Sequence, residues 1–118
     1  MRSRPLLLVA ALAVGERGAI FRSADNALTW HAAASLATAT LTGVAFSSDG
    51  TRGWAVGHDA LILTTTDAGR TWQQQWQGEN LADSFLDILA LDAHRAIAVG
   101  AYGLSVTTTD GGKTWTRW

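Results

Sequence analysis

The stretches Thr65-Thr66-Asp67-Ala68-Gly69-Arg70-Thr71-Trp72 and Thr108-Thr109-Asp110-Gly111-Gly112-Lys113-Thr114-Trp115 share the pattern Thr-x-Asp-x-Gly-x-Thr-Trp. A degenerate third copy, Ser23-Ala24-Asp25-Asn26-Ala27-Leu28-Thr29-Trp30, lies upstream. An Ala-Val-Gly tripeptide precedes each copy, and its glycine lies ten residues before the aspartate in all three. The aspartates are 42 and 43 residues apart. A period of about 40–45 residues with several short strands per unit is typical of β-propeller blades.

Each repeat has the pattern of an antiparallel meander of short strands. In the second repeat we expect strands at 41–46, 53–56, 61–66 and 71–76, separated by turns rich in Asp, Gly and Ser. In the third repeat the corresponding strands are 85–91, 96–99, 104–109 and 114–118. Four such strands make one propeller blade. The first repeat has no room between Leu6 and Val14 for two strands and a turn, so it supplies three strands at most.

The sequence therefore predicts an all-β fold of about three propeller blades, the first of them incomplete. The repeats cover roughly residues 1–40, 41–83 and 84–118 of this 118-residue chain. In a meander, alternate turns lie at opposite ends of the blade. We expect the aspartate turns at one end, and the turns at 16–17, 58–59 and 101–102 at the other end with the linkers at 31–40 and 77–84.

The aspartate motif is expected to be structural, because a catalytic residue has no reason to recur in every repeat. The glycine at its fifth position suits a positive φ, and the aspartate can accept hydrogen bonds from N–H groups of its own turn. Ala27 replaces that glycine in the first copy, which predicts a looser or strained turn. The motif residues assigned this role are Asp25, Trp30, Asp67, Gly69, Trp72, Asp110, Gly112 and Trp115.

Three tryptophans lie outside the motif and are expected to pack within the fold. Trp54 precedes an Ala-Val-Gly and is predicted to pack between blades, since a large aromatic side chain contributes most when it is buried. Trp76 and Trp118 end outer strands, where we expect partial exposure.

Composition argues against several functional classes. The net charge is −1 and the arginines are scattered, so no basic stripe is present to neutralise a nucleic-acid backbone. The chain has no cysteine, which removes disulfides and thiol chemistry. His31, His58 and His94 share no ligand spacing, and no phosphate-binding or dinucleotide motif is present. We expect no metal site and no cofactor.

The N-terminus has two competing interpretations. Arg2 and Arg4 precede the apolar run from Leu6 to Val14, and Ala11-Leu12-Ala13 resembles a small-x-small cleavage site. The same run ends in residues that the first repeat needs as a strand. A signal peptide over Met1–Ala13 predicts export to the periplasm, and a strand there leaves a cytoplasmic location open.

With the blades in place, the chain resembles the BNR, or Asp-box, propellers of the photosystem II stability and assembly factor family. The residues that carry the resemblance are Gly53-Trp54-Ala55-Val56-Gly57-His58-Asp59, Ile97-Ala98-Val99-Gly100-Ala101-Tyr102-Gly103 and the motifs at 65–72 and 108–115. The resemblance implies a non-catalytic and usually exported propeller that scaffolds membrane-protein assembly. Such propellers have about six or seven blades, more than this chain provides.

Our first hypothesis for function is a module that binds a protein partner, such as a membrane-protein complex. The best candidate contacts are the turn residues Arg17, His58, Asp59 and Tyr102. The alternative is a fragment of a sialidase-type glycoside hydrolase with Asp-box repeats. A resemblance to such an enzyme implies an active site with an arginine cluster, a tyrosine nucleophile and a glutamate. In this chain the only tyrosine is Tyr102 and the only glutamates are Glu16 and Glu79.

Three blades cannot close a propeller ring without large gaps, because closed rings typically have about four to eight blades. Two arrangements follow from this. The chain is a fragment of a longer propeller, or two copies form a homodimer that closes a six-blade ring by head-to-tail contacts.

Overall fold

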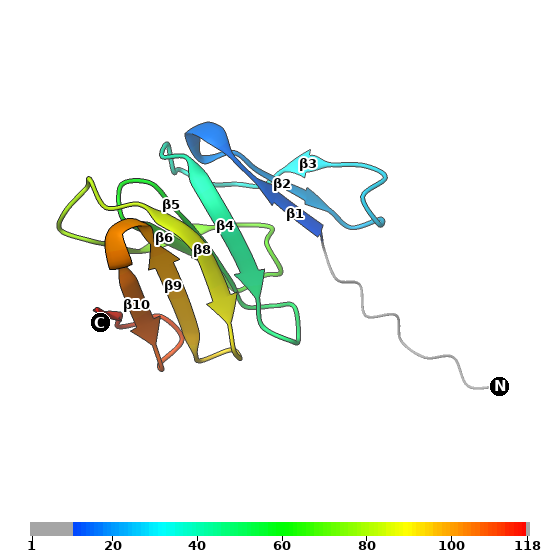
Figure 1. The fold of residues 1–118 in the computed structure, drawn as a ribbon. Coiled ribbons are helices and arrows are strands. Elements are labelled where there is room, and N and C mark those ends of the chain that lie inside the picture. Colours follow the sequence, from blue (N-terminus) through cyan, green and yellow to red (C-terminus); the bar gives the residue numbers. More distant parts are fainter. Residues whose placement is uncertain (1–10, 118) are drawn as a thin grey trace.

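The computed structural model describes residues 11–117, which form three antiparallel sheets arranged as successive propeller blades (Figure 1). The first blade has three strands in the order β1-β2-β3, and the other two have four strands each, in the orders β4-β5-β6-β7 and β8-β9-β10-β11. The prediction of one incomplete and two complete blades is therefore confirmed. The candidate leader Met1–Ala13 lies mostly outside the described residues; only its last three residues are seen, in β1.

The strands and two short 3-10 helices have the following bounds. In the first blade they are β1 (Ala11–Val14), η1 (Glu16–Gly18), β2 (Ile20–Ser23) and β3 (His31–Ala32). In the second blade they are β4 (Leu41–Phe46), β5 (Gly53–Gly57), β6 (Leu61–Thr65) and β7 (Gln73–Gln77). In the third blade they are β8 (Phe85–Ala90), β9 (Ala96–Gly100), η2 (Ala101–Gly103), β10 (Ser105–Thr108) and β11 (Thr116–Arg117).

The fourth strand of each complete blade begins two residues later than predicted. We expected strands from Thr71 and Thr114, but β7 starts at Gln73 and β11 at Thr116. The reason is that the N–H groups of both threonines donate to the aspartate carboxylate of the preceding turn. These residues therefore complete the turn before the ladder begins.

The core lies between the blades. One cluster joins the first two blades and includes Ile20, Leu63 and Trp72, and a second joins blades two and three and includes Trp54, Ile62 and Val106. Because side chains alternate along a strand, β5 sends Ala55 toward the first blade and its two neighbours toward the third. The middle blade is thus buried on both faces, and every residue of β5 is buried.

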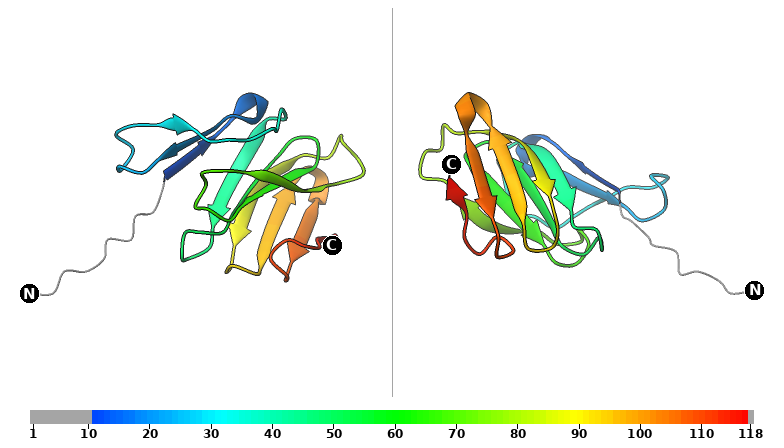
Figure 2. Two further views of the ribbon diagram at one scale, coloured as in Figure 1. Left: turned by 180° about the vertical axis from the view of Figure 1, so that it is seen from behind. Right: turned by 60° about the horizontal axis from the view of Figure 1, so that its bottom comes forward.

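The two ends of the blades carry different turns, as the meander requires. Figures 1 and 2 show η1 and η2 at the same end, together with the linkers that lead from one blade to the next. The aspartate turns lie at the opposite end, with the turns that join the first and second strands of the complete blades. Over residues 11–117, no helix has the length and hydropathy that a membrane span requires.

Candidate functional site

The aspartate turns share one hydrogen-bond pattern in all three blades. In the second copy the hydroxyl of Thr65 donates to Asp67 Oδ1 at 2.8 Å and accepts the N–H of Gly69 at 3.0 Å. Asp67 also accepts the N–H of Thr71 at 2.9 Å on Oδ1 and its hydroxyl at 2.6 Å on Oδ2. The same bonds recur around Asp25 and Asp110. Every one of them closes its own turn, which is the geometry that a structural role predicts.

These hydrogen bonds lower the pKa values of the motif aspartates. The hydroxyl of Thr29, followed by its N–H, lowers the pKa of Asp25 to about 2, and Thr114 does the same for Asp110. Desolvation raises the pKa of Asp67, but the bonds from Thr71 and Thr65 outweigh it and leave the pKa at about 2. A carboxylate held in its ionised form in this way is a weak base, which suits a turn-closing acceptor better than a proton carrier.

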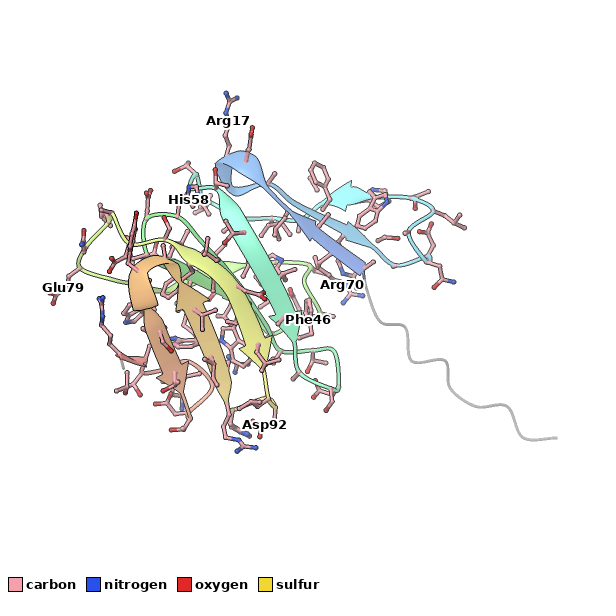
Figure 3. The ribbon with its side chains drawn as sticks, viewed as in Figure 1. Arg17, Phe46, His58, Arg70, Glu79 and Asp92 are labelled. Carbon is pink, nitrogen blue, oxygen red and sulfur yellow. The ribbon has the colours of Figure 1, made fainter. Side chains whose placement is uncertain are left out.

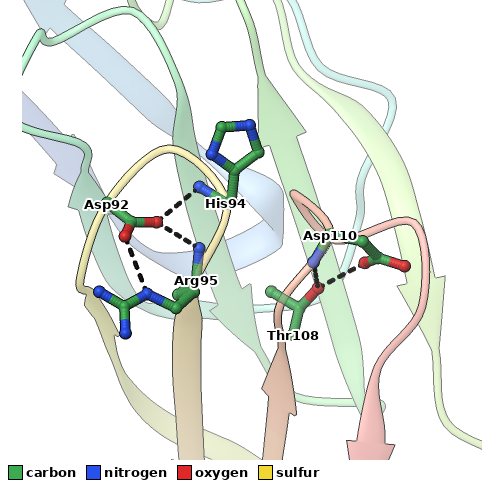
Figure 4. Close-up of polar contacts among 5 residues, drawn as sticks. All are labelled: Asp92, His94, Arg95, Thr108 and Asp110. Carbon is green, nitrogen blue, oxygen red and sulfur yellow. Dashed lines mark hydrogen bonds and ion pairs between the residues drawn. The ribbon is translucent and has the colours of Figure 1, made fainter.

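Two further aspartates at the same end close the turns between first and second strands. Asp92 accepts the N–H groups of His94 at 2.8 Å and Arg95 at 2.7 Å on one oxygen, and the Arg95 side chain on the other at 2.8 Å (Figure 4). The Arg95 side chain is the main cause of the lowered pKa of Asp92, about 2. Asp49 has a comparable role in the second blade. The sequence predicts turns at these positions but not that an aspartate closes each of them.

The first copy of the motif departs from the other two. Ala27 adopts a φ of 67°, a left-handed conformation that Gly69 and Gly112 adopt without steric cost. Its tryptophan, Trp30, is 41% exposed, whereas Trp72 is 5% exposed. The predicted strain is therefore seen in the backbone. Trp30 is less covered than its counterpart because no preceding blade packs on it within residues 11–117.

Trp54 packs between blades as predicted. It is fully buried and meets Trp115 of the third blade edge to face, with ring centroids 6.4 Å apart. Its indole Nε1 donates to Gln75 Oε1 at 2.9 Å. Trp76 is partly buried and packs against the same cluster, and Trp118 lies outside the described residues.

Arginine side chains connect each blade to the aspartate turn of the next blade. These links were not predicted from the sequence. Arg22 donates to the carbonyl oxygen of Ala68 at 2.9 Å, and Arg52 donates to that of Gly111 at 3.0 Å. Ala68 and Gly111 both occupy the fourth position of the motif. The two donors occupy different places, Arg22 within β2 and Arg52 just before β5, so no periodic pattern in the sequence indicates these links.

The candidate binding residues gather at the opposite end of the blades. Arg17 lies in η1, Tyr102 lies in η2, and Asp59 occupies the corresponding turn of the second blade. Their φ values are 58°, 57° and 60°, so three non-glycine residues share one left-handed turn position. All three side chains are exposed, as is His58. Figure 3 shows Arg17 and His58 at this end and Asp92 at the other.

The backbone around these turns is held by hydrogen bonds to the linkers. The N–H of His58 donates to the carbonyl oxygen of Thr40 at 2.9 Å, and that of Ala101 donates to Ser84 at 3.2 Å. The side chain of Gln77 donates to the carbonyl oxygen of Asp59 at 3.0 Å. The turns therefore present their side chains from a fixed frame.

A groove of about 440 Å³ lies at the junction of the second and third blades. Trp76, Phe85 and Trp115 contribute its aromatic lining. Asp83 and Arg117 form an ion pair of 3.1 Å at its edge. The sequence pattern does not predict this groove, because its walls come from a linker and from two blades.

The residues of the glycosidase alternative come from two blades and a linker. Tyr102 lies in η2 of the third blade, Glu16 lies in η1 of the first blade, and Glu79 lies in the linker between β7 and β8. The histidines are also apart, in β3, in the turn after β5 and in the turn after β8. Within the part of the chain that is described, no group of three or more His, Asp or Glu side chains is placed to hold a metal ion.

Comparisons with known proteins identify the family. The model of photosynthesis system II assembly factor YCF48 matches residues 33–118. A structure of YCF48 bound to D1 peptide is 27% identical to this chain, with a TM-score of 0.81. The match covers 93% of this chain and 37% of the YCF48 chain. YCF48 from Cyanidioschyzon merolae is 28% identical, with a TM-score of 0.77. The match covers 92% of this chain and 32% of that YCF48 chain.

A more distant structure, an ancestral GH74 enzyme, shares the fold at 14% identity and a TM-score of 0.75, covering 98% of this chain and 17% of its own. No curated protein matches the chain in sequence. The chain spans about a third of the length of the YCF48 structures, with 37% and 32% of them covered. The repeat pattern, the blade geometry and the family match agree, and the chain belongs to the photosynthesis system II assembly factor YCF48 family.

Proposed function

We propose that this chain is a non-catalytic binding module that holds a segment of a membrane protein during assembly. The family match and the likeness to a YCF48 structure bound to D1 peptide support a protein partner of this kind. We place the contact at the end of the blades that carries Arg17, His58, Asp59 and Tyr102.

The observation that carries this placement is the shared left-handed turn in three successive blades. Residues in this conformation also occur in the aspartate turns, at Asn26, Ala27 and Ala68, but there the motif side chains close the turn, whereas strained positions with free exposed side chains cluster at functional sites. Here the strained position presents Arg17, Asp59 and Tyr102, a cation, an anion and an aromatic ring, to solvent. These groups suit a polypeptide, whose backbone and side chains offer donors, acceptors and apolar surface together. Because the turns are already ordered, binding costs less conformational entropy.

Catalysis has no comparable support in the geometry. The motif aspartates are engaged in closing their own turns, and Tyr102 and Glu16 lie in η2 and η1, which belong to different blades. We therefore assign the aspartate motif to stability and the η1 and η2 end to binding.

The test is the affinity of the chain for a fluorescently labelled D1 peptide, measured by anisotropy. A double variant, His58→Ala with Asp59→Asn, removes the imidazole and the negative charge of one turn and keeps a residue that tolerates left-handed φ. A second variant, Tyr102→Asn, does the same in η2. Both are expected to weaken binding at least about tenfold, a change of about 1.4 kcal/mol.

The matched control is Lys113→Ala, an exposed position at the aspartate-turn end. It is expected to leave the affinity unchanged. Loss of binding in the control with normal binding in the turn variants would move the site to the other end. No binding by the unaltered chain would reject this peptide as its partner.

A further inference from the structure

The blades of this chain pack through two different faces that can be told apart by their cross-strand pairs. One face carries the pairs Ala13–Phe21, Ala55–Leu63 and Ala98–Val106, and we call it the leading face. The other carries the pairs Val14–Ile20, Val56–Ile62 and Val99–Ser105, and we call it the trailing face. At both internal junctions, the trailing face of one blade packs on the leading face of the next.

Two of these faces have no neighbour within residues 11–117. On the trailing face of the third blade, Leu89 is 58% exposed and Val99 is 44% exposed. On the leading face of the first blade, Phe21 is 45% exposed, whereas its counterparts Leu63 and Val106 are at most 2% exposed. Val56, the counterpart of Val99 in the second blade, is fully buried at an internal junction, so a further sheet packed on either open face would cover these side chains in the same way. The two open faces are also of opposite kind, so each is the sort of surface that the other packs on elsewhere in the chain.

The polar contacts at the junctions extend the same register. Arg52 lies just before β5, and its side chain donates across the junction to the carbonyl oxygen of Gly111, the fourth residue of the aspartate motif in the third blade. Arg95 holds the corresponding place just before β9. The corresponding acceptor in the first blade is the carbonyl of Asn26, whose φ of 59° matches the 62° of Ala68. Nε of Arg95 is already paired with Asp92 Oδ2 in its own turn, so a further junction of this design would use a terminal nitrogen of Arg95, as Arg52 uses Nη1, with the carbonyl of Asn26 as acceptor.

We propose that two copies of this chain associate head to tail, with the trailing face of the third blade of each on the leading face of the first blade of the other. Two chains with three sheets each supply six blades, a number that closes a propeller ring. The contact is heterologous and closes after two steps, so both junctions are equivalent. This inference rests on the blade faces and is independent of the proposed binding site.

The experiment begins with sedimentation equilibrium of the full chain over a wide concentration range. The expected result is a particle of twice the 12.5 kDa chain mass. Val99→Asp places a charge on the trailing face, and Phe21→Arg places one on the leading face. Each is expected to raise the dissociation constant of the dimer at least about tenfold, because an unpaired charge resists desolvation in an apolar interface. Leu36→Asp, at a fully exposed linker position, is the matched control and is expected to leave the dimer intact.

Mixing the two variants tests the head-to-tail direction. A chain with Val99→Asp retains its leading face, and a chain with Phe21→Arg retains its trailing face, so one sound junction forms between them. The mixture is therefore expected to form more dimer than either variant alone. Near-ultraviolet circular dichroism of each variant confirms that the blades remain folded, since both replaced side chains are more than a third exposed.

Three results would overturn the proposal. The first is a monomer at all concentrations. The second is a dimer that Val99→Asp dissociates and Phe21→Arg does not, because it would pair like faces. The third is growth into long chains, which would mean that the contact does not close.

Discussion

Nη1 of Arg52 in the second blade lies 3.0 Å from the backbone carbonyl oxygen of Gly111 in the third. The same oxygen accepts Gln75 Nε2 at 3.0 Å, and Gln75 in turn accepts the indole N–H of Trp54 at 2.9 Å. One carbonyl of an aspartate turn thus gathers side chains from two strands and a turn of the neighbouring blade. The motif stabilises its own hairpin and also provides the polar contact between blades.

Removal of this contact is expected to lower stability by a modest amount. Arg52→Ala should reduce the free energy of unfolding by about 1 kcal/mol, because a hydrogen bond from a charged donor is lost while Gln75 still satisfies the acceptor. Urea unfolding monitored by tryptophan fluorescence measures the change. Lys113→Ala, at an exposed position, serves as the control and should change it by less than about 0.5 kcal/mol. An equal loss in both variants would contradict the role assigned to Arg52.

The strained first turn predicts an unusual gain from a glycine. Ala27→Gly should raise the free energy of unfolding by about 0.5 kcal/mol, since it relieves the left-handed φ of 67° but adds freedom to the unfolded chain. Gly69→Ala should lower it by about 1 kcal/mol or more, because φ is 88° and the new Cβ would lie 3.3 Å from Leu12 and Phe46 atoms. Thermal unfolding of the two variants gives the comparison. A loss of stability in Ala27→Gly would show that the first turn is not strained.

The lowered pKa values predict acid sensitivity in a defined range. The folded pKa of Asp67 is about 2 and the ordinary value of an aspartate is 3.8, so its contribution to stability is present above about pH 4 and disappears as the pH falls toward 2. The same sign applies to Asp25 and Asp110. Stability measured by denaturant unfolding is therefore expected to fall between about pH 4 and pH 2.

The cause of that shift can be tested directly by a carboxyl NMR titration. Thr71→Val removes the hydroxyl that donates to Asp67 Oδ2 at 2.6 Å but keeps the N–H that donates to Oδ1. The pKa of Asp67 should rise toward its ordinary value, and that of Asp110 should stay where it is in the unaltered chain. An unchanged Asp67 pKa would assign the shift to the backbone and Thr65 bonds alone.

A glycoside panel separates the binding module from the hydrolase alternative. The chain is expected to release no fluorophore from a broad set of fluorogenic glycosides, because Tyr102 and Glu16 belong to different blades and the motif aspartates are engaged in closing their own turns. Buffer alone gives the background rate. Turnover that disappears in Tyr102→Phe would instead establish a catalytic tyrosine and reject the non-catalytic assignment.

The local parts of the fold could be predicted because their contacts join residues close in sequence. Every hydrogen bond of the aspartate motif spans four residues or fewer, so spacing alone indicated the turn, its positive φ and the strained Ala27. The fixed distance from each Ala-Val-Gly to its aspartate set the hairpin, and its repetition set the number of blades. The strand starts at Thr71 and Thr114 were predicted wrongly, because a strand pattern does not reveal that their N–H groups are already used by the turn.

Only the tertiary structure decided which side chains are covered. Trp30 and Trp72 occupy the same motif position, yet one is 41% exposed and the other 5%, because the first blade packs on Trp72 and no preceding blade within residues 11–117 packs on Trp30. The links from Arg22 to Ala68 and from Arg52 to Gly111 span 46 and 59 residues, beyond any local pattern. Burial and inter-blade hydrogen bonds depend on the neighbouring sheet. The sequence by itself determined the strands and turns of each blade. The packing of one blade on the next determined which faces are buried, which residues bond across the junctions and which surfaces stay open.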